Sequence, residues 1–304
     1  MNSAVPFRDV CWLIALALVW GSSFAAIKVA VETVPPMTLV AARVVIAAGV
    51  LYAVALARGV QLPRDRLSWI MGFALATFGL ALPFFLIGLG QTRIDSGLAA
   101  ILMSVMPLAT MVLAHFFTEG DPFTRHKLFG IVIGFAGIIV LFGPEALRGM
   151  GSDFWYQLAV AGGAVCYAIN AVLTRNLPQG SGSSMIGRAV MVMISGVVIA
   201  VPAALLIDGP MALMQASTMG WWMVIYIGVL PTGLAGLVYF YLIETRGASF
   251  FSFVNYLNPV FGVIWGAVLL GEAVGLQALG ALTLILAGVA VSSRRAPNNP
   301  DMTR

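Results

Sequence analysis

The sequence predicts an all-α polytopic membrane protein with ten transmembrane helices, arranged as two inverted five-helix repeats. Of the 304 residues, 61% are hydrophobic and only 9% are charged. That is too little charge to cover the surface of a water-soluble domain. Apolar runs of roughly 17–25 residues, the length that crosses a bilayer, recur along the whole chain. In addition, one stretch near the end of the chain repeats an earlier one.

Ten apolar runs are separated by short connections that contain Pro, Gly or charged residues. The first run is long and lacks the small-residue exit site of a cleaved signal peptide, so we interpret it as a helix. Residues 294–304 are expected to be a polar cytoplasmic tail. The expected spans are 10–31, 36–57, 67–90, 95–116, 127–143, 153–174, 184–207, 219–243, 247–270 and 274–292.

The repeat is clearest between residues 92–119 (TRIDSGLAAILMSVMPLATMVLAHFFTE) and 245–272 (TRGASFFSFVNYLNPVFGVIWGAVLLGE). Each segment opens with Thr-Arg, carries a proline near its middle and closes on a glutamate, Glu119 or Glu272. Such self-similarity indicates duplicated halves, which we place at 1–150 and 151–293. The matching segments are spans four and nine, so they cross the membrane in opposite directions. An odd number of helices per repeat gives an inverted-topology pair.

The basic residues predict the orientation. Of 16 Lys and Arg, eleven lie on the side of the N-terminus, three (Lys28, Arg93, Arg148) on the other side, and two (Arg43, Arg188) within spans. The positive-inside rule then places both termini in the cytoplasm of a multi-pass inner (plasma) membrane protein. The sequence pI of 9.3 therefore reflects topology signals in short loops, and we expect no nucleic-acid partner.

The segments 20–24 (WGSSF), 107–119 and 259–272, with the Gly-rich stretches around Gly134–Gly137 and Ala287–Gly288, carry a family resemblance. The chain resembles the drug/metabolite transporter superfamily, specifically its ten-helix EamA type with two EamA repeats, along almost its whole length. The resemblance implies an inner-membrane exporter of amino acids or related metabolites, because aromatic amino acid exporters are among the similar members.

Two pairs of prolines fall within corresponding spans: Pro83 with Pro231, and Pro107 with Pro259. A proline removes a backbone donor and clashes with a carbonyl one turn earlier, which bends the helix and frees polar backbone groups. Paired breaks in inverted repeats point to the substrate site, so we predict a gating role for these four residues. The alternative is that they only curve the helices for packing.

Polar and aromatic side chains accompany these breaks, and they predict a cavity lined by spans 1, 3, 4, 6, 8 and 9. An amide or hydroxyl in hydrocarbon needs a partner or water, and helix–helix hydrogen bonding is the alternative to cavity lining. The candidate substrate-binding residues are Trp20, Ser23, Phe24, Phe78, Met103, Tyr167, Asn170, Tyr239, Ser252, Asn255, Tyr256 and Asn258.

This lining favours a neutral or zwitterionic substrate with an apolar or aromatic part. Acidic residues such as Asp95 and Glu272 lie near span ends, which disfavours the proton-for-cation exchange of a lipophilic-cation exporter. We expect a secondary transporter that exports neutral amino acids, aromatic ones first, or related small metabolites across the inner membrane by alternating access. A proton-coupled multidrug or other metabolite exporter, a passive channel and an intramembrane enzyme are the alternatives.

Two arginines sit inside expected spans, Arg43 and Arg188, where a charge is costly unless it reaches water. We expect both to snorkel to the interface, with binding of a substrate carboxylate as the alternative.

Several residue patterns are absent from the sequence. The two cysteines, Cys11 and Cys166, form no disulfide framework or metal cluster. No Gly-rich phosphate loop ending in Lys-Ser/Thr is present, so ATP does not drive the protein directly. The sequence contains no cluster of His, Asp, Glu or Cys of the kind that forms the active site of an intramembrane enzyme. We therefore expect no cofactor and no metal, a lipid bilayer and a small metabolite as partners, and a monomer or weak dimer.

Overall fold

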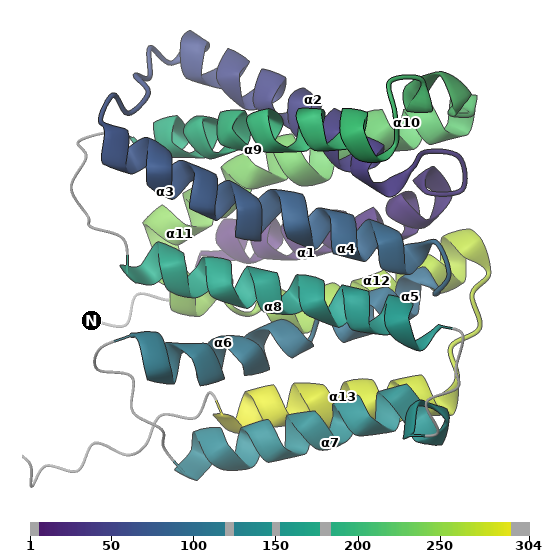
Figure 1. Ribbon diagram of the computed structural model, residues 1–304. Coiled ribbons are helices and arrows are strands. Elements are labelled where there is room, and N and C mark those ends of the chain that lie inside the picture. Colours follow the sequence, from purple (N-terminus) through teal and green to yellow (C-terminus); the bar gives the residue numbers. More distant parts are fainter. Residues whose placement is uncertain (1–5, 119–124, 148–152, 177–183, 293–304) are drawn as a thin grey trace, which may run out of the picture.

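A computed structural model describes residues 6–118, 125–147, 153–176 and 184–292. The expected tail (294–304), Glu119 and Arg148 lie outside these residues. Within them, every regular element is a helix, which confirms the all-α class. The helices lie side by side and run back and forth across the molecule (Figure 1).

The first half begins with two long helices, and the next two expected spans are each interrupted. Its elements are α1 (Phe7–Ala30), α2 (Pro36–Ala57), α3 (Arg66–Ala76), η1 (Thr77–Ala81), α4 (Leu82–Gln91), α5 (Ser96–Leu102), α6 (Val105–Phe117) and α7 (Arg125–Leu147).

The second half follows the same order of long and interrupted helices. Its elements are α8 (Phe154–Asn176), α9 (Met185–Ile207), η2 (Ala212–Gln215), α10 (Thr218–Ile227), η3 (Gly228–Leu234), α11 (Ala235–Phe251), α12 (Val254–Leu270) and α13 (Leu276–Ser292).

Seven helical stretches are long and apolar enough to cross a membrane, and α12 and α13 are shorter apolar helices. The seven are Phe7–Ala30, Pro36–Ala57, Arg66–Gln91, Ser96–Phe117, Phe154–Arg175, Met185–Ile207 and Thr218–Ile243. This confirms a polytopic membrane protein.

Side-chain caps fix where several helices begin. The hydroxyls of Ser184 and Ser217 accept hydrogen bonds from the backbone N–H groups of Gly187 and Gly220. The carboxylate of Asp65 accepts from Ser68 N at 2.8 Å at the start of α3, outside the spans. That backbone hydrogen bond, with the one from the Ser68 hydroxyl, lowers the pKa of Asp65. These caps satisfy N–H groups that have no partner within the helix.

Two spans contain a π-helical segment at matching places. η1 separates α3 from α4, and Pro83 is the second residue of α4, whereas η3 separates α10 from α11 and contains Pro231. A π-helical turn leaves backbone carbonyls without their usual partner, and such turns are frequent at functional sites. Of the first predicted pair, Pro231 therefore lies within a π segment, and Pro83 lies in the first turn of the α-helix that follows one.

The second predicted pair lies beside true interruptions. The break between α5 and α6 falls at Met103 and Ser104, four and three residues before Pro107. In the other half, the expected single span 247–270 is divided: α12 begins at Val254, five residues before Pro259. Gly247 upstream has φ of 80°, a conformation that other residues rarely adopt, so the chain turns there.

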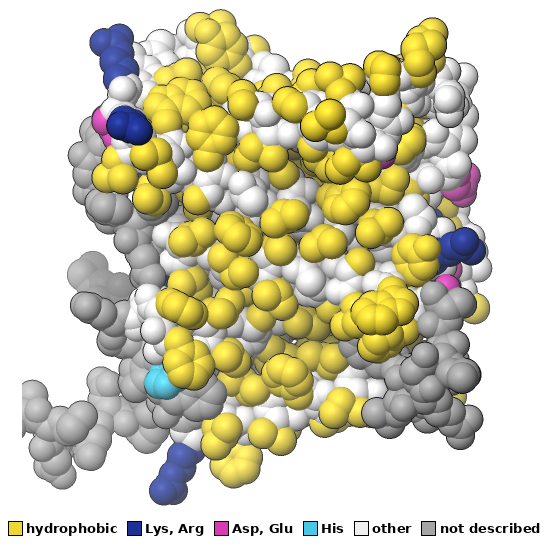
Figure 2. Space-filling view, in the orientation of Figure 1, with side chains coloured by type: hydrophobic (Ala, Val, Ile, Leu, Met, Phe, Trp, Pro, Cys, Tyr) yellow, Lys and Arg dark blue, Asp and Glu magenta, His cyan; other side chains and the backbone are white. Residues whose placement is uncertain are grey.

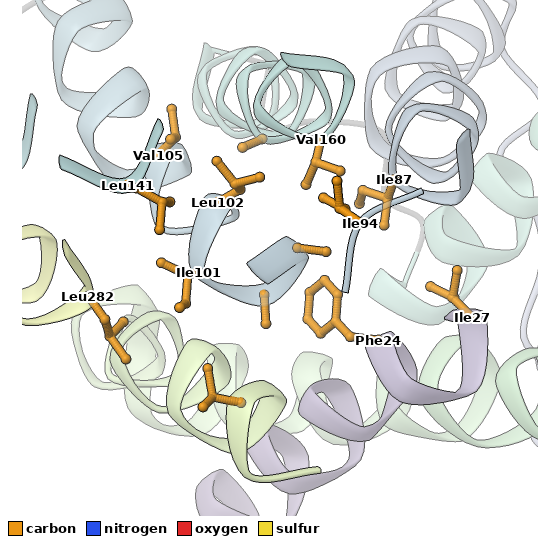
Figure 3. Packing of buried hydrophobic residues seen from close by; sticks show 14 of the residues in the cluster. Phe24, Ile27, Ile87, Ile94, Ile101, Leu102, Val105, Leu141, Val160 and Leu282 are labelled. Carbon is orange, nitrogen blue, oxygen red and sulfur yellow. The ribbon is translucent and has the colours of Figure 1, made fainter. Parts of the chain in front are cut away.

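The short helix α5 forms the centre of the apolar core. Figure 3 shows Ile101 and Leu102 of α5 surrounded by side chains from other helices, among them Phe24 and Val160. α12 approaches α5 very closely, because a Cβ on Gly262 would overlap the Cβ of Ala100. Small residues allow this close approach between membrane helices.

The surface matches a bilayer environment. Figure 2 shows hydrophobic side chains over the middle of the visible face, whereas Lys, Arg, Asp and Glu gather toward the two ends of the helices. Many large apolar side chains are exposed, for example Phe135 at 48% and Val198 at 54%. Lipid would cover such residues.

Candidate functional site

Trp20 of α1 is fixed to the π segment of the second half. Its indole Nε1 donates a hydrogen bond of 2.9 Å to the carbonyl of Pro231 in η3. The ring lies 6.3 Å from Tyr239 and 5.9 Å from Phe251, and these two rings are 4.8 Å apart at an angle of 80°. We name Trp20, Tyr239 and Phe251 the aromatic cluster. Its edge-to-face geometry is favourable for aromatic pairs and presents π surfaces from α1 and α11.

Arg43 lies inside the protein and not at the interface. The residue is only 5% exposed, and its guanidinium carbon lies 3.5 Å from the ring centroid of Phe84. Nε and Nη2 donate to the hydroxyl of Thr232 at 3.3 and 2.9 Å. The expectation that Arg43 snorkels is therefore wrong, because Thr232 and Phe84 hold it within the bundle. Arg188 is exposed, as expected.

Arg43 connects the two π-interrupted spans. Phe84 follows Pro83 in the first turn of α4, just after η1, and Thr232 follows Pro231 within η3. The ring of Phe84 also contacts Tyr167 of α8, with centroids 6.4 Å apart. Two predicted helix breaks and one predicted lining residue thus meet around a single buried cation.

Asn170 of α8 packs against η1. A Cβ added to Gly79 would lie 2.9–3.1 Å from the side-chain amide atoms of Asn170, so the amide covers the backbone of the π segment. The hydroxyl of Thr174 donates to the carbonyl of Asn170 at 2.8 Å. Phe78, next to Gly79, is half-buried. Each π segment is therefore contacted by a polar or charged side chain from another helix.

Phe24, Met103 and Tyr256 lie in the apolar core around α5, Phe24 being 7% exposed (Figure 3). The carbonyl of Phe24 accepts a 2.8 Å hydrogen bond from Nε2 of Gln91, a side chain with no exposed surface. Within the described residues, the other amide atom, Oε1 of Gln91, has no partner. In this conformation Phe24, Met103 and Tyr256 therefore contribute to the packing of the core.

The remaining candidates divide by exposure. Ser23 is half-buried and its hydroxyl donates to the carbonyl of Trp20 at 2.6 Å. Ser252 is exposed beside the break before α12, whereas Asn255 and Asn258 are half-buried. The buried oxygen Oδ1 of Asn258 has no hydrogen-bond partner in the described part of the chain.

Sequence reasoning did not find a group of charged side chains at the N-terminal end of α1. The carboxylate of Asp9, with no exposed surface, pairs with Arg246 and accepts from the hydroxyl of Tyr241 at 2.9 Å. Arg8 donates to the same hydroxyl at 2.6 Å. We name Asp9, Tyr241 and Arg246 the α1–α11 clasp. An acidic residue at the edge of an apolar run needs such a partner, and that was the available signal.

Glu272 joins the two halves where the end of α12 meets the start of α5. Its carboxylate accepts hydrogen bonds from the backbone N–H groups of Ser96 and Gly97 at 2.7 and 2.8 Å, and from the Ser96 hydroxyl at 2.9 Å. A carboxylate at these free N–H groups caps α5 and complements its dipole.

A cleft of about 680 Å³ opens beside the clasp, between α1, α2, α9 and α11. Its wall combines basic and aromatic side chains, and no predicted site residue lines it. Arg8, Trp12, Arg58, Phe240 and Tyr241 are among the lining residues. Among the described residues, no three His, Cys, Asp or Glu side chains are grouped as metal ligands.

The comparisons with known proteins agree with this architecture. The chain is similar to the uncharacterized inner membrane transporter YedA of Escherichia coli K12, with 29% identity over 92% of this chain and 87% of the relative. It is similar to the uncharacterized transporter YoaV of Bacillus subtilis 168, with 23% identity over 91% and 94% of the two chains. A protein of known crystal structure has the same fold, with a TM-score of 0.67 and 21% identity over 94% of this chain and 97% of that chain.

The family signature itself occurs twice. The model of the EamA-like transporter family matches residues 8–143 and again residues 154–294. Together these matches cover most of the chain, and relatives from two bacteria are transporters by name. The chain therefore belongs to the EamA-like transporter family of membrane proteins.

Proposed function

We propose that this protein is a secondary transporter that exports neutral amino acids, aromatic ones first, or related small metabolites across the inner membrane by alternating access. The family supplies the general function, transport by a multi-pass membrane protein. The substrate, the direction and the mechanism are the proposal.

The proposed architecture has ten membrane helices in two inverted five-helix repeats, 1–150 and 151–293, with both termini in the cytoplasm. Two family matches, one per half, support the duplication. The interruptions also recur in the same order: a π segment precedes a broken helix in each half, as η1 with the α5–α6 break and as η3 with the α11–α12 break.

The aromatic cluster is the observation that carries the substrate proposal. Three rings converge from α1 and α11, and one of them is fixed to a carbonyl of an interrupted helix. A flat apolar substrate would stack on such rings, and a shift of η3 would move Trp20 with it. Substrate contact and helix rearrangement are therefore coupled at one hydrogen bond.

Gating is assigned to the prolines and to the α1–α11 clasp. Pro83 and Pro231 lie in or beside π segments, and Pro107 and Pro259 lie just after breaks, where the backbone bends at low cost. The clasp closes the N-terminal end of the bundle, because Arg246 of α11 reaches Asp9 of α1 directly before the turn at Gly247. Breaking this ion pair would open that end.

A proton-coupled exporter of lipophilic cations is the second candidate, and Asp9 is the observation in its favour. A carboxylate without exposed surface is the type of group that exchanges a proton for a cation. In the structure that carboxylate already forms an ion pair with Arg246. This pairing favours a structural role for Asp9, the closure of one end of the bundle, over proton exchange.

The deciding experiment is uptake of labelled phenylalanine into proteoliposomes, with and without a pH gradient, beside labelled threonine and a lipophilic cation. Saturable aromatic uptake that is trans-stimulated and indifferent to the gradient is expected. Proton-driven movement of the cation without aromatic flux would replace the proposal by the second candidate. A flux that neither saturates nor responds to trans substrate would indicate a channel.

A further inference from the structure

Arg43 is a buried charge without an opposite charge. It is 5% exposed, and in the described part of the chain no carboxylate forms an ion pair with it. A cation in an apolar interior is costly unless it is paired or faces water. Charged side chains inside membrane segments mark substrate pathways for this reason.

The partners of Arg43 offset only part of this cost. A guanidinium carries five N–H donors, and the hydrogen bonds seen both go to one atom, the hydroxyl oxygen of Thr232. That hydroxyl donates its own proton to the carbonyl of Ile227 at 2.8 Å, so it acts toward Arg43 purely as a neutral acceptor. The ring of Phe84 adds a cation–π contact. Neither partner carries negative charge.

The position of Arg43 is that of a substrate site. It bridges Phe84 and Thr232, the residues that follow the paired prolines of the two π-interrupted spans. Tyr167, a predicted lining residue, makes an edge-type ring contact with Phe84. In a transporter of inverted repeats, the site lies where interrupted helices of the two halves meet.

We infer that Arg43 receives the carboxylate of the transported substrate, so that this site selects compounds bearing a carboxylate beside an apolar or aromatic part. The inference rests on the proposed transport function and narrows its substrate class. When the helices part, the carboxylate replaces the Thr232 hydroxyl at the guanidinium, whose planar fork suits two parallel hydrogen bonds. A phosphate dianion would need more cationic partners than the one arginine present.

The second half supplies a matched control. Arg188 is the fourth residue of α9 and Arg43 is the eighth residue of α2, but the side chain of Arg188 is exposed. A general effect of removing a positive charge from an early turn of the second helix of a half would affect both residues alike. A role in carboxylate binding belongs to Arg43 alone.

The test measures binding to the purified full-length protein by ligand-dependent thermal stabilisation. The ligands are L-phenylalanine, L-phenylalaninamide, 3-phenylpropionate and phenyl phosphate, and the variants are Arg43→Gln, Arg43→Lys and Arg188→Gln. Loss of a charge-assisted pair weakens binding roughly 10- to 100-fold. We expect that loss for both carboxylates in Arg43→Gln, partial retention in Arg43→Lys, unchanged binding of the amide, and no effect in Arg188→Gln.

Other outcomes overturn the inference or separate it from the proposed function. If Arg43→Gln weakens the binding of phenylalanine and of its amide equally, or weakens the binding of neither, Arg43 is only a structural bridge. Stabilisation by phenyl phosphate in preference to both carboxylates also overturns the inference, as does the absence of any carboxylate-dependent stabilisation. If 3-phenylpropionate binds through Arg43 but no amino acid does, the amino acid substrate fails and the carboxylate receptor stands.

A second variant covers the case in which Arg43→Gln does not fold. Thr232→Val removes the competing acceptor but keeps the arginine and the shape of the side chain. The ratio of carboxylate to amide affinity is then expected to rise several-fold, because the guanidinium no longer gives up a hydrogen bond on binding. An unchanged ratio overturns the inference.

Discussion

The indole of Trp20 is held by one hydrogen bond that joins α1 to an interrupted helix 211 positions away. The acceptor is the carbonyl of Pro231, in a π segment where the backbone pattern is irregular. The same ring packs edge-on against Phe251. The position and the orientation of the Trp20 ring therefore depend on one donor atom, its Nε1.

Trp20→Phe keeps an aromatic ring but removes the donor. We expect it to lower the free energy of unfolding by about 1 kcal/mol, the typical net value of one hydrogen bond. Aromatic uptake should also weaken, because the ring is no longer tied to η3. Thermal unfolding in detergent and proteoliposome uptake measure the two effects. Trp155→Phe is the control, since Trp155 is 74% exposed; equal behaviour of the two variants would contradict the prediction.

Side-chain partners were the part of the site that the sequence could not predict. Arg43 was expected to snorkel because its position in the span is near an interface, but its acceptor Thr232 lies 189 positions away. The first span was expected to begin at residue 10, whereas α1 begins at Phe7 and includes Asp9. Local hydropathy penalises such a carboxylate, and only the tertiary contact with Arg246 removes the penalty.

At the scale of elements, the regular helices were the most predictable part. The span expected at 36–57 coincides with α2, whose Pro36 provides a helix start. The prolines indicated which spans are interrupted, yet the interruptions lie upstream, at Met103–Ser104 and before Val254. A proline displaces the carbonyl one turn earlier, and packing decides which residues absorb that change.

The contact between α5 and α12 gives an element-scale prediction with a matched control. Gly262→Ala places a methyl group on the Cβ of Ala100, whereas Gly236→Ala in α11 meets nothing within 4 Å. Overpacking of this kind is expected to destabilise the protein by about 1–3 kcal/mol. Thermal unfolding should therefore show a lower Tm for Gly262→Ala only. A similar Tm for both variants would mean that the helices separate easily.

The clasp gives a second prediction at this scale. Asp9→Asn leaves Arg246 without its charge partner, and the N-terminal ends of α1 and α11 should separate more often. Leu242, with no exposed surface, reports this opening when it is replaced by cysteine in a Cys11→Ser background. We expect its maleimide labelling to be at least several-fold faster with Asp9→Asn. Arg64→Gln, which removes an exposed basic side chain from the connection between α2 and α3, is the control; equal rates in both variants would argue against a clasp.

For the whole molecule, the distribution of basic residues predicts the orientation in the membrane. Green fluorescent protein fused to either terminus should fluoresce in bacterial cells, because it folds in the cytoplasm. Alkaline phosphatase fused after Arg93 should be active and fused after Arg58 should be inactive. The opposite pattern would place both termini, and with them the clasp, on the outer side of the membrane.

Several contacts that build the candidate site cross from one half of the chain to the other. Trp20 needs Pro231, Arg43 needs Thr232, and the start of α5 needs Glu272. During synthesis, the first helices enter the bilayer before these partners have been synthesised. A newly inserted Arg43 must therefore keep water, lipid phosphate or an insertion factor beside its charge until residue 232 follows. The late steps of biogenesis, and not the insertion of the first helices, are where this chain is most open to quality control.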